Sequence, residues 1–470
     1  MSAKYHIPVR RVAARFSATA RSTLLDWGEG CLRCTRCVKQ TCPVAAYKNR
    51  DFDPGQLVDS IEELCRDCYR CVQGCPRELV FKTLNPQYRQ LGDEYWTPEI
   101  IHQTWYQAES GKIPVSGAGY GGPFSGPGFD SIWTDMSEIV RPTRDGIHGR
   151  EYISTTIDLG RKPMFLAFDD QGRMLFAPPP LLELPLPVVL AEPPLGPDRA
   201  RLRQMLAQAA GSLDTLVVLP RDAITPELAP FAKHLVPSLP ILVDLKDSLL
   251  SQVRVVELAD HPQVLAQMEA ITKEFSELLI SVKVLADGQS VTRVAELTAA
   301  GVGIIRILAS RQARGIGEYQ DVHLKDLIRR CHLRLVEDKL RDTVTLLVGG
   351  GIALAEHVAK AILCGADGLV VDIPLLLALE CRWCAQCEEG GSCPIELEKL
   401  PVKRGAQRMV NLIGAWNNQL LEILGAMGMR EVRRLRGEVG RAMFIEDLEK
   451  EIFAPLFAHR EGELLKREPT

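Results

Sequence analysis

The sequence predicts an α/β protein whose largest part is a TIM-like (β/α)8 barrel, with a small cysteine-rich α+β module before it and helices after it. Eight apolar runs rich in Val, Ile and Leu occur over roughly 200 residues, which is the size of such a barrel. Continuous runs of this kind are typical of strands buried on both faces of a parallel sheet. Amphipathic stretches separate most of the runs, and twelve of the 14 cysteines fall into three spaced motifs.

The bulk composition is that of an ordinary globular protein with two or three domains. The chain has 470 residues, of which 46% are hydrophobic and 25% charged. A formal net charge of −4 gives no nucleic-acid signature. No apolar run reaches the roughly 18 residues of a membrane span, so none is expected. Thiolate ligands in these numbers require a reducing compartment, so we expect a cytoplasmic protein.

Residues 1–25 form a basic segment with many Arg, Ser and Ala residues and no acid. A transit peptide has this composition. No cleavage signal is visible, however, and we favour a basic arm that packs along a neighbouring surface. Positive charge around the cysteine-rich module would also attract an acidic redox partner.

Residues 26–90 contain two motifs that point to iron–sulfur clusters. They read Cys31-x2-Cys34-x2-Cys37-x4-Cys42-Pro43 and Cys65-x2-Cys68-x2-Cys71-x3-Cys75-Pro76. Three cysteines at two-residue gaps can bind three corners of a cubane, and the remote cysteine before a proline serves the other cluster. We therefore assign one [4Fe-4S] cluster to Cys31, Cys34, Cys37 and Cys75, and a second to Cys65, Cys68, Cys71 and Cys42. A four-cysteine zinc site or disulfides are the alternatives, and the pair of Cys-Pro endings disfavours both.

Residues 91–162 read as a connector. Thr97-Pro98-Glu99 is a good helix start, with a capping hydroxyl, a proline in the first turn and an acid at the positive end. We expect this helix to end at Ser110, before Gly111. The stretch Gly117–Gly122 fits a G-x-G-x-x-G pattern, but the prolines and glycines that follow exclude the helix that a dinucleotide site needs, so we interpret it as an irregular loop.

Residues 163–380 should form the barrel, opened by a hairpin of 164–168 and 173–176. The expected strands are Val188–Ala191, Leu216–Leu219, Ile241–Leu245, Val253–Leu258, Leu279–Leu285, Gly303–Ala309, Val344–Val348 and Leu369–Ile373. The expected helices are Arg199–Ala209, Val264–Glu277, Ser290–Ala299 and Ala353–Leu363. An open doubly wound sheet is the alternative, because Lys246–Gln252 is too short for a normal crossover helix.

The last strands of the barrel carry the candidate chemistry. Gly349, Gly350 and Gly351 end the seventh run before a helix, so their bare backbone can approach a phosphate group there. A tight βα turn explains the same glycines without a ligand.

A third cysteine motif, at residues 381–395, directly follows the eighth run. It reads Cys381-x2-Cys384-x2-Cys387-x5-Cys393-Pro394. Four thiolates could hold [4Fe-4S], three could hold [3Fe-4S], and zinc is the alternative. Cys331 and Cys364 have no motif and should be buried apolar residues. The remainder, 396–470, should be helical, with helices at 404–433 and 443–466.

Together these features resemble the archaeal-type glutamate synthase domain, a form of the FMN-binding glutamate synthase family with an N-terminal dicluster ferredoxin. The resemblance spans nearly the whole chain. The segments that carry it are Trp96–Glu99, Gln107–Gly111, Ile280–Lys283, Ala299–Gly303, Gly349–Ile352, Gly365–Asp367 and the Cys381 motif, and Asp135–Gly160 resembles the family's connector.

The resemblance implies that the barrel binds FMN, that Lys283 faces the flavin pyrimidine, and that 2-oxoglutarate with ammonia is reduced to glutamate. It also implies a [3Fe-4S] cluster with a C-x5-C-x4-C pattern. Cys381 and Cys387 match the first gap, Cys393 matches the third ligand with one extra residue, and the additional Cys384 favours a four-iron cluster. The implied partners are a ferredoxin or an NAD(P)H-oxidising subunit, and a separate amidotransferase subunit, within a hetero-oligomer.

The sequence departs from the family at three places. The substrate loop Lys-x-Gly-Glu-Gly-Gly has no match between Ile241 and Glu277. Arg311–Gly317 replaces the Gly-Gly-Thr-Gly segment after the sixth strand, and Val370–Ile373 replaces Gly-Ile-Gly-Thr after the eighth. Asp372 would thus put a carboxylate where an FMN phosphate should lie, and like charges repel.

These observations leave two hypotheses. The first is an iron–sulfur flavoprotein oxidoreductase subunit that relays electrons from the ferredoxin-type clusters to FMN, for reduction of 2-oxoglutarate, iminoglutarate or another small acceptor. The second is a non-catalytic electron-transfer or scaffold subunit of a larger redox complex, whose barrel has lost FMN. Asp372 and the missing loop favour the second hypothesis, whereas Lys283 and Gly349–Gly351 favour the first.

Overall fold

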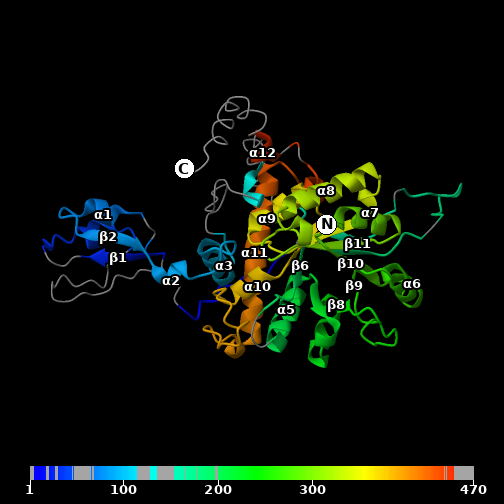
Figure 1. Ribbon diagram of the computed structural model, residues 1–470, viewed down its shortest axis with the longest axis horizontal. Coiled ribbons are helices and arrows are strands. Elements are labelled where there is room, and N and C mark those ends of the chain that lie inside the picture. Colours follow the sequence, from blue (N-terminus) through cyan, green and yellow to red (C-terminus); the bar gives the residue numbers. More distant parts are fainter. Residues whose placement is uncertain are drawn as a thin grey trace, which may run out of the picture.

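A computed structural model shows a chain of three parts arranged along its long axis (Figure 1). It describes residues 5–448 apart from 17–18, 20, 27–29, 45, 47–64, 66–67, 114–127, 135–152, 164, 176, 196–198, 439 and 441. A small module with β1, β2 and α1 lies at one end and the barrel at the other, with α3 and α11 between them. The Gly117–Gly122 stretch lies outside the described residues.

The cysteine-rich module has very little apolar core. β1 (Ser22–Asp26) pairs antiparallel with β2 (Val80–Leu84). A π-helical turn, η1 (Arg36–Thr41), and α1 (Arg70–Gly74) pack against each other. Among the residues of the module that the structure describes, the buried apolar cluster comprises Ala46, Cys71 and Val80. Bound clusters would add to the stability of so small a core.

The connector helix begins and ends where its caps predict. α3 (Pro98–Ser110) starts after Thr97, whose hydroxyl accepts a hydrogen bond from the Ile100 N–H, and it stops at Gly111, which has φ 67°. A short helix, α2 (Pro86–Arg89), precedes it. Further along the connector, η3 (Gly128–Ser131) and β3 (Ile132–Thr134) pack together, and β3 pairs with β14 (Ala442–Phe444).

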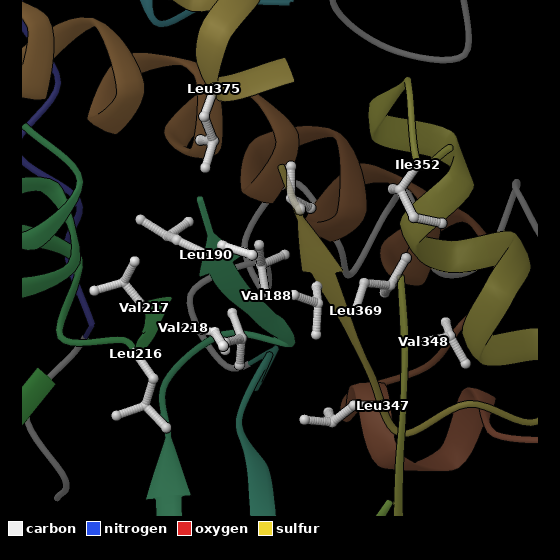
Figure 2. Packing of buried hydrophobic residues seen from close by; sticks show 14 of the residues in the cluster. Val188, Leu190, Leu216, Val217, Val218, Leu347, Val348, Ile352, Leu369 and Leu375 are labelled. Atoms are coloured by element: carbon white, nitrogen blue, oxygen red, sulfur yellow. The ribbon is translucent and has the colours of Figure 1, made fainter. Parts of the chain in front are cut away.

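Eight parallel strands close the barrel, so the open-sheet alternative is wrong. In chain order they are β6 (Val188–Ala191), β7 (Val217–Pro220), β8 (Leu235–Leu239), β9 (Val255–Ala259), β10 (Leu279–Leu285), β11 (Ile304–Leu308), β12 (Thr345–Gly349) and β13 (Gly368–Val371). The last strand pairs with the first, Leu369 opposite Val188 and Val371 opposite Leu190. Figure 2 shows the interlocked Val and Leu side chains at this closing seam.

Helices cover the barrel on its outer side. They are α5 (Arg199–Leu213), α6 (Val264–Glu274), α7 (Ser290–Ala299), α8 (Leu324–Glu337), α9 (Ala355–Leu363) and the short α10 (Ile373–Ala378). The first half is irregular, as its short spacings indicated. Between β7 and β8 the chain forms only 3-10 turns, η5 (Arg221–Ala223) and η6 (Pro226–His234).

The third barrel strand is the one that the sequence misplaced. The strand is Leu235–Leu239, whereas the expected run Ile241–Leu245 lies in a loop where Leu242 is 89% exposed. Pro237 lies inside the true strand, and proline in an apolar run normally argues against a central strand. The apolar pattern alone therefore placed the strand at Ile241–Leu245, directly after the true strand.

Two antiparallel strands precede the first barrel strand in the chain. β4 (Ile157–Gly160) pairs antiparallel with β5 (Leu181–Leu184), and the Gly160 N–H donates to the Thr345 hydroxyl at the start of β12. The hairpin expected at 164–168 and 173–176 lies between β4 and β5 along the chain, and Phe168 pairs with Met174 in it.

The C-terminal region is dominated by one long helix. α11 (Val402–Ala426) has 25 residues and packs against α3, α5, α9 and α10, between the connector and the barrel (Figure 1). It is followed by η10 (Val432–Leu435) and α12 (Ile445–Leu448). The helix expected at 443–466 therefore begins as strand β14 and is helical at α12, and its residues after 448 lie outside the described part of the chain. No helix in the described part of the chain is long and apolar enough to cross a membrane.

The N-terminal arm packs on the chain's own helix. The Asn411 and Gln407 side chains of α11 bond to the backbone and side chain of Arg10, and the Val12 N–H donates to the Glu109 carbonyl. Gly414 of α11 has Val9 against it, so that an added Cβ would lie 2.6 Å from Val9 Cγ2. Residues 5–16 thus pack on the chain's own surface, and the choice between an arm and a transit peptide stays a prediction.

Candidate iron–sulfur sites and barrel mouth

The four cysteines assigned to the first cluster line one pocket. Cys31, Cys34, Cys37 and Cys75 surround it. The Leu79 N–H donates to Cys75 Sγ at 3.3 Å. Burial raises the pKa of the Cys75 thiol, but the backbone N–H groups that follow it outweigh burial and leave the pKa below its usual value. This environment favours a thiolate, which is the form that binds iron.

The second set repeats this local geometry. The Ala46 N–H donates to Cys42 Sγ at 3.3 Å, four residues on, just as Leu79 does to Cys75. Cys71 is buried and lies on α1, as Cys37 lies on η1. The gathering of Cys42, Cys65, Cys68 and Cys71 around one cluster stays a prediction, supported by this internal repeat.

The third motif also closes on a single pocket, at the end of α10. It is lined by Cys381, Cys384, Cys387 and Cys393. Burial and, to a smaller extent, the other three sulfurs raise the pKa of the Cys381 thiol to about 12, against the opposing effect of the Trp383 N–H, which lies 3.4 Å from Cys381 Sγ. Bound iron would offset this cost by neutralising the crowded thiolates. All four cysteines, Cys384 included, face the same space.

Zinc is the alternative to iron–sulfur clusters at the cysteine motifs. Within the described part of the chain, no three His, Cys, Asp or Glu side chains come close enough together to hold one metal ion. A cluster has its irons at separate corners and needs a wider set of thiolates than a single tetrahedral zinc. The assignment of clusters rather than zinc to these cysteines stays a prediction.

Backbone strain in the described residues is concentrated in the three cysteine loops. Eight of the eleven non-glycine residues with positive φ lie there, namely Arg33, Thr35, Tyr69, Glu78, Glu380, Trp383, Ala385 and Glu396. Each such residue costs on the order of 1 kcal/mol and persists only where the surroundings enforce it. Left-handed residues also turn successive N–H groups inward to form a nest for an anion. A thiolate-bound cluster is such an anion, so the loops fit it.

The connector is built into the third cysteine loop. Trp383 Nε1 donates to Asp93 Oδ2 at 2.7 Å, and Trp105 Nε1 of α3 donates to the Cys381 carbonyl at 3.2 Å. The Gly92 N–H donates to the Arg382 carbonyl. The segment that leaves the ferredoxin-like module thus ends at the loop that would hold the third cluster.

The interior of the barrel contains an ion-pair network that the apolar pattern did not reveal. Arg306 of β11 donates to both carboxylate oxygens of Glu257 on β9, at 3.0 and 3.3 Å, and Lys283 Nζ of β10 is 3.9 Å from Glu257. Glu257 is 1% exposed and Arg306 is 7% exposed. Arg306 Nε has no hydrogen-bond partner among the described residues. The available signal was a charged residue inside each of two apolar runs, Glu257 in Val253–Leu258 and Arg306 in Gly303–Ala309.

Lys283 lies where the sequence placed it, near the carboxyl end of a barrel strand. Its side chain keeps 27% of its surface exposed, in contrast to Glu257 and Arg306. Side chains at this end of a parallel barrel line its mouth, where ligands of such barrels bind. An exposed ammonium at that position can contact an anionic ligand.

The glycine turn is packed by the chain itself. Gly350 has φ 94°, and an added Cβ there would lie 2.3 Å from the Ala309 carbonyl oxygen; the corresponding Cβ at Gly351 would lie 2.1 Å from the Ala313 nitrogen. The Tyr95 hydroxyl donates to the Gly351 carbonyl at 2.5 Å. Glycine is needed at these positions because the backbone of 309–313 packs directly against them. This agrees with the interpretation of the glycines as a tight βα turn.

Asp372 occupies the start of the short helix that follows the last strand. Its Oδ1 accepts a hydrogen bond from the Ile373 N–H at 2.6 Å and caps α10. Burial raises the pKa of this carboxyl, whereas the Ile373 N–H and the Arg306 and Arg311 cations lower it. A carboxylate thus stands where a barrel's phosphate group often meets a short extra helix. The mouth therefore suits the ring end of FMN at Lys283 and does not suit its phosphate.

Fold and sequence together define a parallel-barrel protein that carries three cysteine motifs. The comparisons give its relatives. Residues 248–430 match the family described as the conserved region in glutamate synthase. The chain carries this region and is a distant relative of the archaeal-type glutamate synthases.

Similarity to these relatives extends over almost the full length. The archaeal-type glutamate synthase [NADPH] of Dehalococcoides mccartyi is 26% identical, over 87% of this chain and 92% of that protein. The archaeal glutamate synthase [NADPH] of Archaeoglobus fulgidus is 25% identical, over 90% and 94%. That of Methanocaldococcus jannaschii is 24% identical, over 90% and 94%.

Proposed function

We propose that this chain is a glutamate synthase-like oxidoreductase subunit that relays electrons from its N-terminal clusters, through a third cluster, to the mouth of the barrel. The observation that carries the proposal is the third cysteine pocket. It lies directly after the last barrel strand and is hydrogen-bonded to the connector that leaves the ferredoxin-like module. The connector would thereby join one end of the relay to the other.

The residues that would hold the clusters are the three cysteine sets. We assign [4Fe-4S] to Cys31, Cys34, Cys37 and Cys75, and a second to Cys42, Cys65, Cys68 and Cys71. Cys381, Cys384, Cys387 and Cys393 would hold a third, most simply [4Fe-4S] because all four line its pocket. Such clusters supply one-electron transfer when bound.

The mouth of the barrel supports an anionic acceptor. The Lys283 ammonium and the Arg306 guanidinium can attract a carboxylate and stabilise negative charge that develops on it. The proposed acceptor is 2-oxoglutarate, or iminoglutarate formed from it. Reduction of 2-oxoglutarate with ammonium to glutamate takes up two electrons and two protons and releases water, so two one-electron deliveries complete one turnover.

Partner proteins follow from the same proposal. Electrons would enter from a ferredoxin or an NAD(P)H-oxidising subunit, and ammonia from a separate amidotransferase subunit, within a hetero-oligomer in the cytoplasm. The exposed Cys34 and Cys68 of the small module mark where an electron donor would approach.

A second function is favoured by one observation. Asp372 caps α10, and the chain's own backbone packs on Gly349–Gly351, so the barrel lacks a usual seat for the FMN phosphate. The chain would then be an electron-transfer subunit whose barrel serves as a scaffold.

One preparation decides between the two functions. The protein is purified without oxygen, flavin is released by acid and identified by fluorescence, and iron and sulfide are measured alongside. Near-stoichiometric FMN with about twelve irons, as three four-iron clusters contain, supports the enzyme and leads to a 2-oxoglutarate assay. Full iron without flavin, even after FMN is added back, supports the electron-transfer subunit. Lys283→Ala then gives a second test, since it should abolish acceptor reduction only in the enzyme.

A further inference from the structure

The N-terminal arm reaches the third cysteine loop at Arg15. Residues 5–16 of the arm are held along α11 by side chains of that helix; the Arg408 guanidinium, for example, donates to the Val12 carbonyl. At the end of this path the Arg15 N–H donates to Glu380 Oε1 at 2.6 Å, and Arg15 Nε donates to Glu380 Oε2 at 2.8 Å. Glu380 immediately precedes Cys381.

Arg15 also holds the other end of the same loop. Its Nη2 donates to the Ile395 carbonyl at 2.7 Å, and its Nη1 donates more weakly to the Glu396 carbonyl at 3.4 Å. Ile395 follows Cys393 and Pro394 and lines the cysteine pocket. One side chain therefore connects the residue before the first cysteine to the residues after the last.

Glu380 is held in a costly conformation at this contact. It has φ 74°, a left-handed value that favours glycine, and it is 5% exposed. A second cation, Arg408, lies 3.8 Å from it and is itself fully buried. A buried carboxylate in a strained backbone persists only if its surroundings compensate it, and here two arginines do so.

We propose that the N-terminal arm is a clamp on the third cluster, in which Arg15 is a positioning residue that closes the cysteine loop through Glu380 and Ile395. Arm docking and cluster retention are then coupled, and the coupling acts in both directions. Loss of the clamp exposes the cluster, and loss of the cluster frees the arm. This inference rests on the proposed third cluster.

The first test compares two arginines of the same arm. Arg15→Ala removes the clamp, whereas Arg11→Ala is the matched control, because the Arg11 side chain is 78% exposed and, among the described residues, pairs with Glu109 on α3 and with nothing in the third cysteine loop. A variant with Cys384→Ser and Cys387→Ser defines how much iron belongs to the third cluster. Each full-length protein is exposed anaerobically to an iron chelator, and iron release is followed by absorbance and EPR.

We expect Arg15→Ala to release the iron of the third cluster at least tenfold faster than the wild type, while the other eight irons leave at the wild-type rate. Arg11→Ala should match the wild type, and Arg15→Lys, which keeps the charge but not the fork of donors, should fall between. Equal release from Arg15→Ala and the wild type overturns the clamp. If the double cysteine variant holds as much iron as the wild type, the third cluster itself is absent and the proposed function fails with it.

The second test removes the other partner and measures the arm. Glu380→Gly breaks the clamp and leaves the buried Arg408 without its carboxylate, so it should speed iron release and lower the unfolding midpoint. Adding Arg15→Ala should then change iron release little further. In the double cysteine variant, hydrogen exchange at the amides of Arg15 and Val12 should speed up at least tenfold. Unchanged exchange at both amides, with the third cluster lost, contradicts the coupling.

Discussion

Removing the charge of Asp372 should let the barrel bind FMN more tightly. The carboxylate caps α10 at 2.6 Å from the Ile373 nitrogen, where the phosphate would otherwise meet the helix. Asp372→Asn keeps a side-chain oxygen that can accept the same hydrogen bond, so it changes the charge and little else. Asp372→Gly removes both the charge and the cap.

The size of the effect follows from Coulomb's law. Two unit charges about 4 Å apart repel by about 4 kcal/mol at an effective dielectric constant of 20. Arg306 and Arg311 lie near enough to lower the pKa of Asp372 and offset part of this repulsion. We therefore take about 2 kcal/mol, which is roughly a thirtyfold gain in FMN affinity for Asp372→Asn. Asp372→Gly should add a loss of about 1 kcal/mol of stability from the missing cap.

Quenching of FMN fluorescence on titration with anaerobic protein measures the affinity directly. Riboflavin, which lacks the phosphate, is the control ligand, and its affinity should not respond to Asp372→Asn. The affinity of the wild type for FMN should also rise as the pH is lowered, because protonation neutralises the carboxyl. Equal FMN affinities for wild type and Asp372→Asn would refute the argument that this carboxylate occupies the phosphate position.

Three further predictions follow from buried charges and thiols. Arg306→Met should lower the free energy of unfolding in urea by about 3–5 kcal/mol, because it leaves the buried Glu257 with Lys283 at 3.9 Å as its remaining cation. Adding Glu257→Gln should recover much of this loss, and a loss below about 1 kcal/mol for Arg306→Met contradicts the reasoning. Burial, with help from Lys325 and Arg314, lowers the pKa of His323 to about 4. The unfolded chain thus binds the extra proton first, so about 2–3 kcal/mol of stability should disappear as the pH falls from 6.5 to 4, and His323→Gln should flatten this dependence. Cys384→Ser should convert the third cluster to a [3Fe-4S] form with its own EPR signal, whereas Cys331→Ser should leave the iron content unchanged. If Cys384→Ser keeps all its iron, Cys384 is not a ligand and three cysteines hold the third cluster.

The sequence by itself determined the class of fold and most of its elements, because these depend on local patterns. Continuous apolar runs located seven of the barrel strands, since a strand buried on both faces admits little else. Thr97, Pro98 and Gly111 determined both ends of α3, because capping is a property of a few adjacent residues. The spacing of Cys31, Cys34 and Cys37 and the proline after Cys75 were enough to group the sulfurs that line one pocket.

Only the tertiary structure decided which residues from distant segments meet. The third strand was hidden by Pro237, whose place in β8 depends on pairing with β7 rather than on its neighbours in sequence. Glu257 and Arg306 each look like an interruption of a strand until barrel closure brings them together. Arg15 and Glu380 are 365 residues apart, and their contact depends on how the arm lies along α11. Spacing along the chain carries no information about such pairs, because long-range contacts are chosen by packing after the local elements have formed.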